Sequence, residues 1–323
     1  MTAEEGGGGG TLKKAAIDMD GILNFRDLAD ASSVLAPGRV FRTGTPGKAS
    51  DADASKILTD LRVARLLDLR STDEWEPEPG PMQAKFEIRA FSREEEKDGG
   101  GDQSQNTAAA AAAAAAFDRV VGDDARAGRL VRYHSPLLDY DRYYREIAER
   151  MSTFEKFQAA VYTVQAKLVD DTNQRRLFIG KVNEGGLYLL NEVMVDSSGP
   201  EINAALSVLA ASSDQSPTAF YCKAGKDRTG LVAALTLHCC GVSDKDIIAD
   251  YHRSQGVGRA ALGGGRIERG VKLDYTRFHG APEEVMEHVL KYVRGKYGSI
   301  DSYLDGIGFD GEKRRRLAAA LCE

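Results

Sequence analysis

One junction between a strand-like run and a helix-like run constrains the fold more than any other segment. The stretch SPTAFYCKAGKDRTGLVAALTLHCCG, residues 216–241, places a short apolar run before a loop that contains Gly, Lys, Asp and Arg. A run of ten residues without glycine or proline follows, LVAALTLHCC, and it is typical of a helix. The sequence therefore predicts a buried strand that passes through a tight loop into a helix, with Cys222 where the strand ends.

The same alternation of strand and helix recurs along the chain. Strands are predicted at residues 64–70, 129–138 and 218–221. Helices are predicted at residues 50–63, 139–168, 184–196 and 200–212. Strands separated by helices indicate an α/β fold with a mostly parallel central sheet flanked by helices. Ligands of such sheets bind beyond the carboxyl ends of the strands, which is the predicted position of Cys222.

The domain organisation is predicted to be simple. Residues 1–15 form a flexible glycine-rich tail, and residues 16–323 form a single domain with a low-complexity, alanine-rich insertion at about 92–128. The insertion contains nine consecutive alanines, Ala108 to Ala116. Alanine favours a helix, but the run lacks an amphipathic face, so we expect a weakly held surface arm.

Composition excludes several classes of protein. A chain of 323 residues with 42% hydrophobic residues can bury a full core, and its net charge of -6 favours neither nucleic acid nor an anionic membrane surface. No run approaches the roughly 20 apolar residues of a membrane span. The four cysteines lack the spacing of a disulfide framework, which indicates a reduced, cytoplasmic protein. The five histidines lack metal-ligand spacing, so no metal or other cofactor is expected, and the oligomeric state is not indicated.

The loop after the strand has the composition of an anion-binding site. Lys223, Ala224, Gly225 and Lys226 can turn successive backbone N–H groups inward, and the start of the next helix adds a partial positive charge. A phosphate fits such a cradle. The planar guanidinium of an arginine can bind two phosphate oxygens, and the same positive field favours the thiolate form of a cysteine. We therefore expect Cys222 to be a nucleophile at neutral pH.

These residues resemble the CxxxxxR signature of the cysteine-dependent protein tyrosine phosphatases. Within that superfamily the sequence is similar to the bacterial-type tyrosine and phosphoinositide phosphatases, whose loop reads HCxxGKDRTG. Other parts of the chain extend the resemblance: NFRDLAD (24–30), GRVFRTG (38–44), LLDLRSTDEWE (66–76), IIADYHRSQ (247–255) and YGSIDSYLDGIGF (297–309). The resemblance implies a phosphatase-like fold and a phosphomonoester hydrolase.

It also implies roles for residues of the loop. Cys222 would form a phosphocysteine, Arg228 would bind the phosphoryl oxygens, and Thr229 would hydrogen-bond the sulfur, cap the helix, or do both. The leaving oxygen needs a proton, for which Asp227 is the first candidate and Asp139 the alternative. An ion pair with Lys226 or Arg228 is the structural alternative for Asp227.

The substrate is less constrained. Phosphotyrosine in a protein is the leading candidate, and a phosphoinositide or inositol phosphate comes second because Lys223 and Lys226 could meet additional phosphates. Asp68 and Arg70, at the end of a predicted strand, would brace the loop by ion pairing or contact the substrate. The family places His before the nucleophile, whereas this chain has Tyr221, which has no cationic form. A catalytically impaired phosphate-binding protein is therefore a further alternative.

Overall fold

A computed structural model describes residues 17–74, 80, 82–91, 103–138, 140–168, 170–257, 266–268 and 271–322. Its main sheet has six strands in the order β1-β2-β6-β3-β5-β4. The strands are β1 (Arg26–Asp27), β2 (Val40–Thr43), β3 (Arg65–Asp68), β4 (Glu87–Ala90), β5 (Val131–His134) and β6 (Thr218–Tyr221). Only β1 in this sheet runs antiparallel to its neighbour, so the predicted mostly parallel α/β sheet is confirmed.

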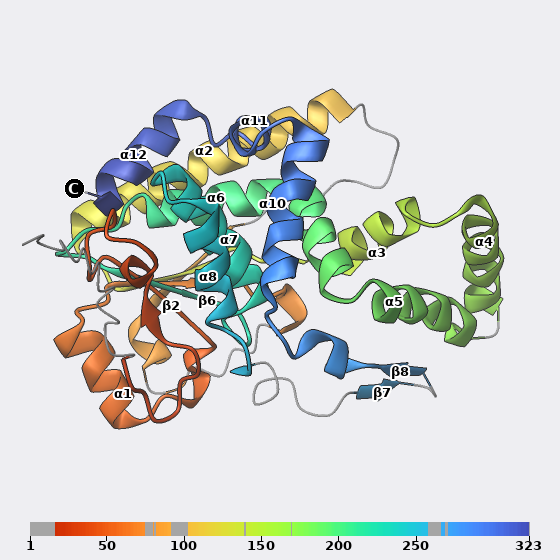
Figure 1. Cartoon of the computed structure of the whole chain (residues 1–323), viewed down its shortest axis with the longest axis horizontal. Helices are drawn as coiled ribbons and strands as arrows, with labels where there is room; N and C mark the ends of the chain where they lie inside the picture. The colour runs from red at the N-terminus through yellow and green to blue at the C-terminus, as the bar shows by residue number, and fades with distance from the viewer. Residues whose placement is uncertain are drawn as a thin grey trace, which may run out of the picture.

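Helices cover both faces of this sheet (Figure 1). The short α1 and a π-helical turn pack on one face, and the larger layer of helices covers the other. The helices are α1 (Asp51–Ser55), α2 (Gln103–Ala127), α3 (Tyr140–Glu149), α4 (Thr153–Leu168), α5 (Thr172–Ser197), α6 (Gly199–Leu209), α7 (Asp227–Cys239), α8 (Asp244–His252), α10 (Glu283–Tyr297), α11 (Ile300–Gly306) and α12 (Gly311–Cys322). A separate antiparallel hairpin joins β7 (Arg266–Glu268) to β8 (Val271–Leu273).

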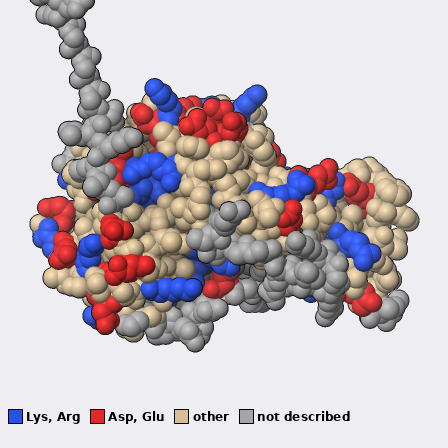
Figure 2. Space-filling model, turned by 60° about the horizontal axis from the view of Figure 1, so that its bottom comes forward, with Lys and Arg blue, Asp and Glu red and all other residues tan. Residues whose placement is uncertain are grey.

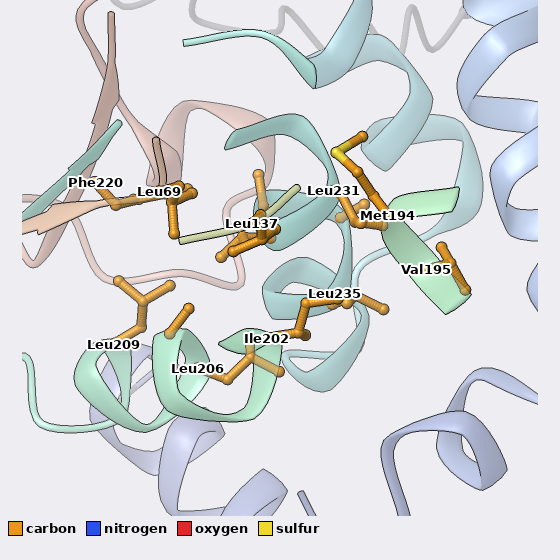
Figure 3. Packing of buried hydrophobic residues seen from close by; sticks show 14 of the residues in the cluster. Leu69, Leu137, Met194, Val195, Ile202, Leu206, Leu209, Phe220, Leu231 and Leu235 are labelled. Atoms are coloured by element: carbon orange, nitrogen blue, oxygen red, sulfur yellow. The ribbon is translucent and has the colours of Figure 1, made fainter. Parts of the chain in front are cut away.

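The central strand β6 shows how the sequence divides the core between the two faces. Ala219 and Tyr221 point into the smaller cluster under α1, whereas Phe220 and Cys222 point into the larger cluster under α6 and α7. This is the two-residue period of a strand buried on both faces. Figure 3 shows part of the larger cluster, to which Phe220 of β6, Leu206 of α6 and Leu231 of α7 belong. Cys222 is thus placed on the α7 side of the sheet.

Two predicted helices differ in their boundaries. One long helix is predicted at residues 139–168, but the structure has two helices there, because α3 ends at Glu149 and α4 begins at Thr153. Ser152 and Glu155 explain the break, since each side chain accepts a hydrogen bond from the backbone N–H of the other, which is the capping box that starts a helix. The helix predicted at 184–196 begins earlier, at Thr172, and bends at Gly186, whose φ is 53°.

The expectation of a weakly held alanine arm is wrong for the described part of α2. Ala114, Phe117 and Val121 are buried in the main core, and α2 packs along α6. The ring of Phe117 lies edge-on to those of Phe91 and Tyr133, at centroid distances of 5.4 and 5.7 Å. The spacing of these three buried residues along α2 makes one apolar stripe, which only appears when the alanine run is read together with the segment after it.

Other expectations fall outside the described residues or remain untested. The tail at 1–15 and residues 92–102 lie outside them, and the domain boundaries stay a prediction. In the part of the chain that the structure describes, no helix is long and apolar enough to cross a membrane. On the face in Figure 2, basic and acidic side chains are interspersed.

Candidate active site

The candidate site is built on the segment from Cys222 to Arg228, here called the signature loop. It leaves the carboxyl end of β6, between β2 and β3, and enters the first turn of α7. Cys222 is only 3% exposed and lies at the lining of a cavity, together with Lys223, Ala224, Asp227 and Arg228. The sequence-predicted junction and the five residues are therefore brought together at one site.

Gly225 allows the loop to turn. Its φ is +67°, in the left-handed region that favours glycine. A Cβ at this position would lie 2.3 Å from the carbonyl oxygen of Thr43, because the loop passes directly over the end of β2. Both the backbone conformation and the close approach therefore require glycine here.

Arg228 is held by Glu74, a residue that the sequence reasoning missed. Its Nη2 lies 3.1 Å from Glu74 Oε1, and its Nη1 donates to Oε2 of the same carboxylate. Ser71 donates its backbone N–H and its hydroxyl to Oε2 at 3.2 and 3.1 Å. Burial opposes ionisation of Glu74, but the charge of Arg228 and these hydrogen bonds outweigh it and lower the pKa of Glu74 to about 2. The position of Glu74 in the sequence, shortly after β3, could have indicated a contact with the loop, because the carboxyl end of β3 lies next to that of β6.

Asp227 lines the cavity and has two partners. Its Oδ1 lies 3.0 Å from Nζ of Lys226 and accepts a hydrogen bond of 3.3 Å from the hydroxyl of Tyr251. The ion pair expected as the structural alternative is therefore present. Asp227 nevertheless belongs to the lining of the cavity, so the ion pair does not withdraw it from the site.

Lys226 does not face the cavity, contrary to the expectation that its ammonium would meet substrate phosphates. The side chain is fully buried, and Nζ donates to the backbone carbonyls of Phe278 and Gly280. With Asp227 these carbonyls use all three donors of the ammonium group. Lys223, in contrast, is exposed and lines the cavity.

Thr229 forms neither of its expected contacts. Its hydroxyl is buried, and within the described ranges it has no hydrogen-bond partner, the sulfur of Cys222 included. The N-cap of α7 is Lys226, whose side chain makes no capping hydrogen bond, so Thr229 is not the cap either. A buried hydroxyl that makes no hydrogen bond among the described residues therefore lies directly after Arg228 in the sequence.

Tyr221 belongs to an ion-pair network behind the loop. Its hydroxyl accepts a hydrogen bond of 3.0 Å from Nε of Arg132, and Arg132 Nη2 lies 2.7 Å from Asp68. Arg70 pairs with the same carboxylate at 2.8 Å and stacks over the Tyr221 ring. Burial of Asp68 opposes its ionisation, but the two arginines outweigh it and lower its pKa. Asp68 is fully buried and neither it nor Arg70 lines the cavity, so the bracing role is the one that the geometry fits.

The cavity above the loop has a volume of about 240 Å³ and mostly apolar walls. Tyr143 and Tyr144 come from α3, and Ile179 from the first half of α5. Leu273 of β8 and the aromatic residues Tyr275 and Phe278 of the following turn also line the cavity. A flat apolar group attached to a phosphate fits this combination of polar floor and apolar wall. The alternative general acid, Asp139, lies outside the described residues.

Comparison with known proteins agrees with this geometry. A sequence model described as "Tyrosine phosphatase family" matches residues 17–323. The chain belongs to the tyrosine phosphatase family. The prediction of a phosphatase of the protein-tyrosine-phosphatase type is therefore confirmed at the level of the family.

Two relatives of this family carry specific names. A "Tyrosine-protein phosphatase" of Nostoc commune is 31% identical over 140 residues, which are 38% of this chain and 45% of that protein. The "Triple specificity protein phosphatase PtpB" of Mycobacterium tuberculosis is 26% identical over 242 residues, 74% of this chain and 69% of the relative. The match thus spans less than half of the Nostoc protein's length.

Proposed function

We propose that this phosphatase hydrolyses phosphomonoesters through a phosphocysteine on Cys222, with phosphotyrosine in proteins as its leading substrate. The observation that carries the proposal is the position of Cys222 beside Arg228 at the lining of a cavity with apolar and aromatic walls. The loop amides, the α7 N-terminus and Arg228 supply positive charge where the phosphoryl group would lie.

The reaction follows in two steps. The Cys222 thiolate attacks phosphorus, the bond from phosphorus to the ester oxygen breaks, and the leaving oxygen takes a proton from an aspartic acid. Water then attacks phosphorus and gives a proton to the aspartate formed in the first step. The sulfur–phosphorus bond breaks, inorganic phosphate leaves, and the thiolate and the aspartic acid are both restored. Asp227 is the first candidate for the proton donor because it lines the cavity, and Asp139 is the alternative.

A phosphoinositide or inositol phosphate is the second candidate substrate. Of the two lysines that could meet additional phosphates, Lys223 lines the cavity, whereas Lys226 is fully buried. The apolar walls suit an aryl group better than a polyhydroxylated ring. A reduced, cytoplasmic location stays part of the proposal because a nucleophilic thiolate is preserved under reducing conditions, and all four cysteines are free.

The test is phosphate release from a phosphotyrosine peptide, a phosphoserine peptide and an inositol phospholipid, each with a chelator present. We expect the phosphotyrosine peptide to be the best substrate and Cys222→Ser to abolish its turnover. Cys240→Ser, a buried cysteine outside the cavity, is the matched control and should keep turnover. A wild-type protein that binds phosphate but turns over none of the three would instead support the impaired binding protein suggested by Tyr221.

A further inference from the structure

Three successive backbone carbonyls of the signature loop accept hydrogen bonds from residues that do not line the cavity. The carbonyl of Lys223 accepts from the backbone N–H of Thr45 at 3.2 Å. The carbonyls of Ala224 and Gly225 accept from the side-chain amide of Asn24 at 3.2 and 2.8 Å. Arg42 adds a second donor to Gly225, at 3.0 Å. Three successive peptide units of the loop are thus held by hydrogen bonds from residues outside the loop.

A peptide unit is planar and trans, so its N–H points opposite to its carbonyl. A carbonyl held outward at one residue therefore turns the N–H of the next residue toward the cavity. In the ranges that the structure describes, the N–H groups of Ala224, Gly225 and Lys226 donate to no acceptor. These three donors are oriented and free, as an anion-binding nest requires.

The conformation and contacts of Asn24 orient its side-chain amide toward the loop carbonyls. Its backbone is in the left-handed region, with φ of 61°, which asparagine tolerates better than most residues. Its Oδ1 accepts from Nη1 of Arg26, which fixes Nδ2 as the atom that faces the loop. Nδ2 also lies 3.2 Å from Oγ of Ser254. The side-chain amide is therefore oriented by contacts on both ends.

Arg42 is held in a similar way. Its side chain is fully buried, and Nη1 pairs with Asp250. The same carboxylate pairs with Nε of Arg26 at 3.0 Å, so one acid orients both arginines. The segments NFRDLAD, GRVFRTG and IIADYHRSQ, which lie far apart in the sequence, thus meet behind the signature loop.

We infer that Asn24 and Arg42 are positioning residues that set the anion affinity of the signature loop by holding its carbonyls outward. The inference rests on the proposed phosphate site and assigns that site its supporting residues. If Asn24 only stabilised the fold, its loss would lower the melting temperature and leave the anion affinity of the folded protein unchanged. Anion affinity therefore separates the two roles.

The experiment measures binding of tungstate, a tetrahedral oxyanion, by isothermal titration calorimetry at a temperature where every variant is folded. Asn24→Asp replaces the donor by a carboxylate oxygen facing two carbonyls, and we expect it to weaken tungstate binding by at least tenfold. Asn24→Gly removes the amide while allowing the positive φ, and we expect a smaller loss, of about threefold to tenfold, in line with one or two hydrogen bonds.

Asn203→Asp is the matched control. Nδ2 of Asn203 also donates to a backbone carbonyl, that of Ile307 at 3.0 Å, and Asn203 does not line the cavity. We expect its melting temperature to fall and its tungstate affinity to stay within twofold of the wild type. If Asn24→Asp fails to fold, Asn24→Gly decides the question alone.

Two results would overturn the inference: wild-type affinity in the folded Asn24 variants, or no tungstate binding by the wild type. Its failure can be told from that of the proposed function. A wild type that binds tungstate but hydrolyses no phosphoester would refute the proposed hydrolysis, and the loss of affinity in the Asn24 variants would still support the positioning role.

Discussion

Glu74 and Arg228, 154 positions apart in the sequence, are joined by two hydrogen bonds at the lining of the cavity. Both terminal nitrogens of the guanidinium are used, which fixes the plane of the group. In the proposed reaction Glu74 would hold Arg228 in one orientation before the substrate binds. The contribution of this ion pair to the free energy of unfolding depends on pH, because Glu74 forms the ion pair only when its carboxylate is ionised.

Replacing Glu74 by Gln should lower the free energy of unfolding at pH 7 by on the order of 2 kcal/mol. The pKa of Glu74 is lowered from its usual 4.5 to about 2 in the folded protein. Its contribution is therefore complete above the unfolded value and is lost as the pH falls from about 4.5 toward 2. Urea unfolding should show a difference between wild type and variant that is about 1 kcal/mol smaller at pH 3.5 than at pH 7.

The control for this measurement is Glu87→Gln, which removes an exposed carboxylate paired with Arg89 at the sheet edge. It should change the unfolding free energy by less than about 0.5 kcal/mol at both pH values. An equal effect of Glu74→Gln at pH 7 and pH 3.5 would contradict the assignment.

The general acid can be identified through the leaving group. The tyrosine phenolate has a conjugate acid of pKa about 10 and needs protonation, whereas an activated nitrophenolate leaves without help. Asp227→Asn should lower turnover of a phosphotyrosine peptide by about 10²-fold and spare the activated substrate. Asp139→Asn should do much less. Steady-state kinetics on both substrates provide the measurement, and the opposite pattern would transfer the role to Asp139.

Variants of the two lysines in the signature loop should differ in their effect on stability. Lys226→Met breaks a buried ion pair with Asp227 and leaves two carbonyls without a donor, so it should cost about 3 kcal/mol of unfolding free energy. Lys223→Met, at an exposed position, should cost less than about 0.5 kcal/mol. Urea unfolding measures both.

Lys223→Met also tests the phosphoinositide alternative. If Lys223 meets a second phosphate, the variant should lose more kcat/KM on a bisphosphorylated inositol lipid than on a phosphotyrosine peptide. Equal losses on the two substrates would remove the remaining lysine argument for the lipid.

Packing of the alanine-rich helix gives a further prediction. Phe117→Ala should lower the free energy of unfolding by about 3–5 kcal/mol, because it leaves a cavity between α2 and the sheet. Val120→Ala, at a position 38% exposed on the same helix, is the control and should cost under about 1 kcal/mol. A small loss for Phe117→Ala in denaturant unfolding would restore the original expectation of a weakly held arm.

The strands and the loop junction were predictable because their signals are local. Leu66 and Leu67 in β3 and the three residues that follow Thr218 in β6 are consecutive hydrophobic residues, as strands buried on both faces require. The break before α4 was missed although Ser152 and Glu155 carry the capping-box pattern. The core contacts of Phe117 were not predicted, because the apolar stripe of α2 begins inside the alanine run and continues after it. The alanine run alone shows no apolar face.

The site was predictable only as far as it is continuous in sequence. Cys222 and Arg228 were found from their spacing, but Glu74, Asn24 and Arg42 reach the loop across 154 or more positions. Sheet order creates those contacts, and a single sequence does not show which strand ends are neighbours. The side-chain direction of Lys226 was not predictable either, because it depends on carbonyls of a turn near residue 280.

Tyr221 gives the site a property that a histidine at the same place would not give. Histidine titrates near neutral pH, whereas burial raises the pKa of Tyr221 well above its usual value, so its hydroxyl keeps the proton. The charges beside it belong to Asp68, Arg70 and Arg132. Burial opposes ionisation of Asp68, but the two arginines outweigh it and lower its pKa. Tyr221 therefore stays neutral and undergoes no change of charge in the neutral pH range, whereas a histidine at this position would take up and release a proton there.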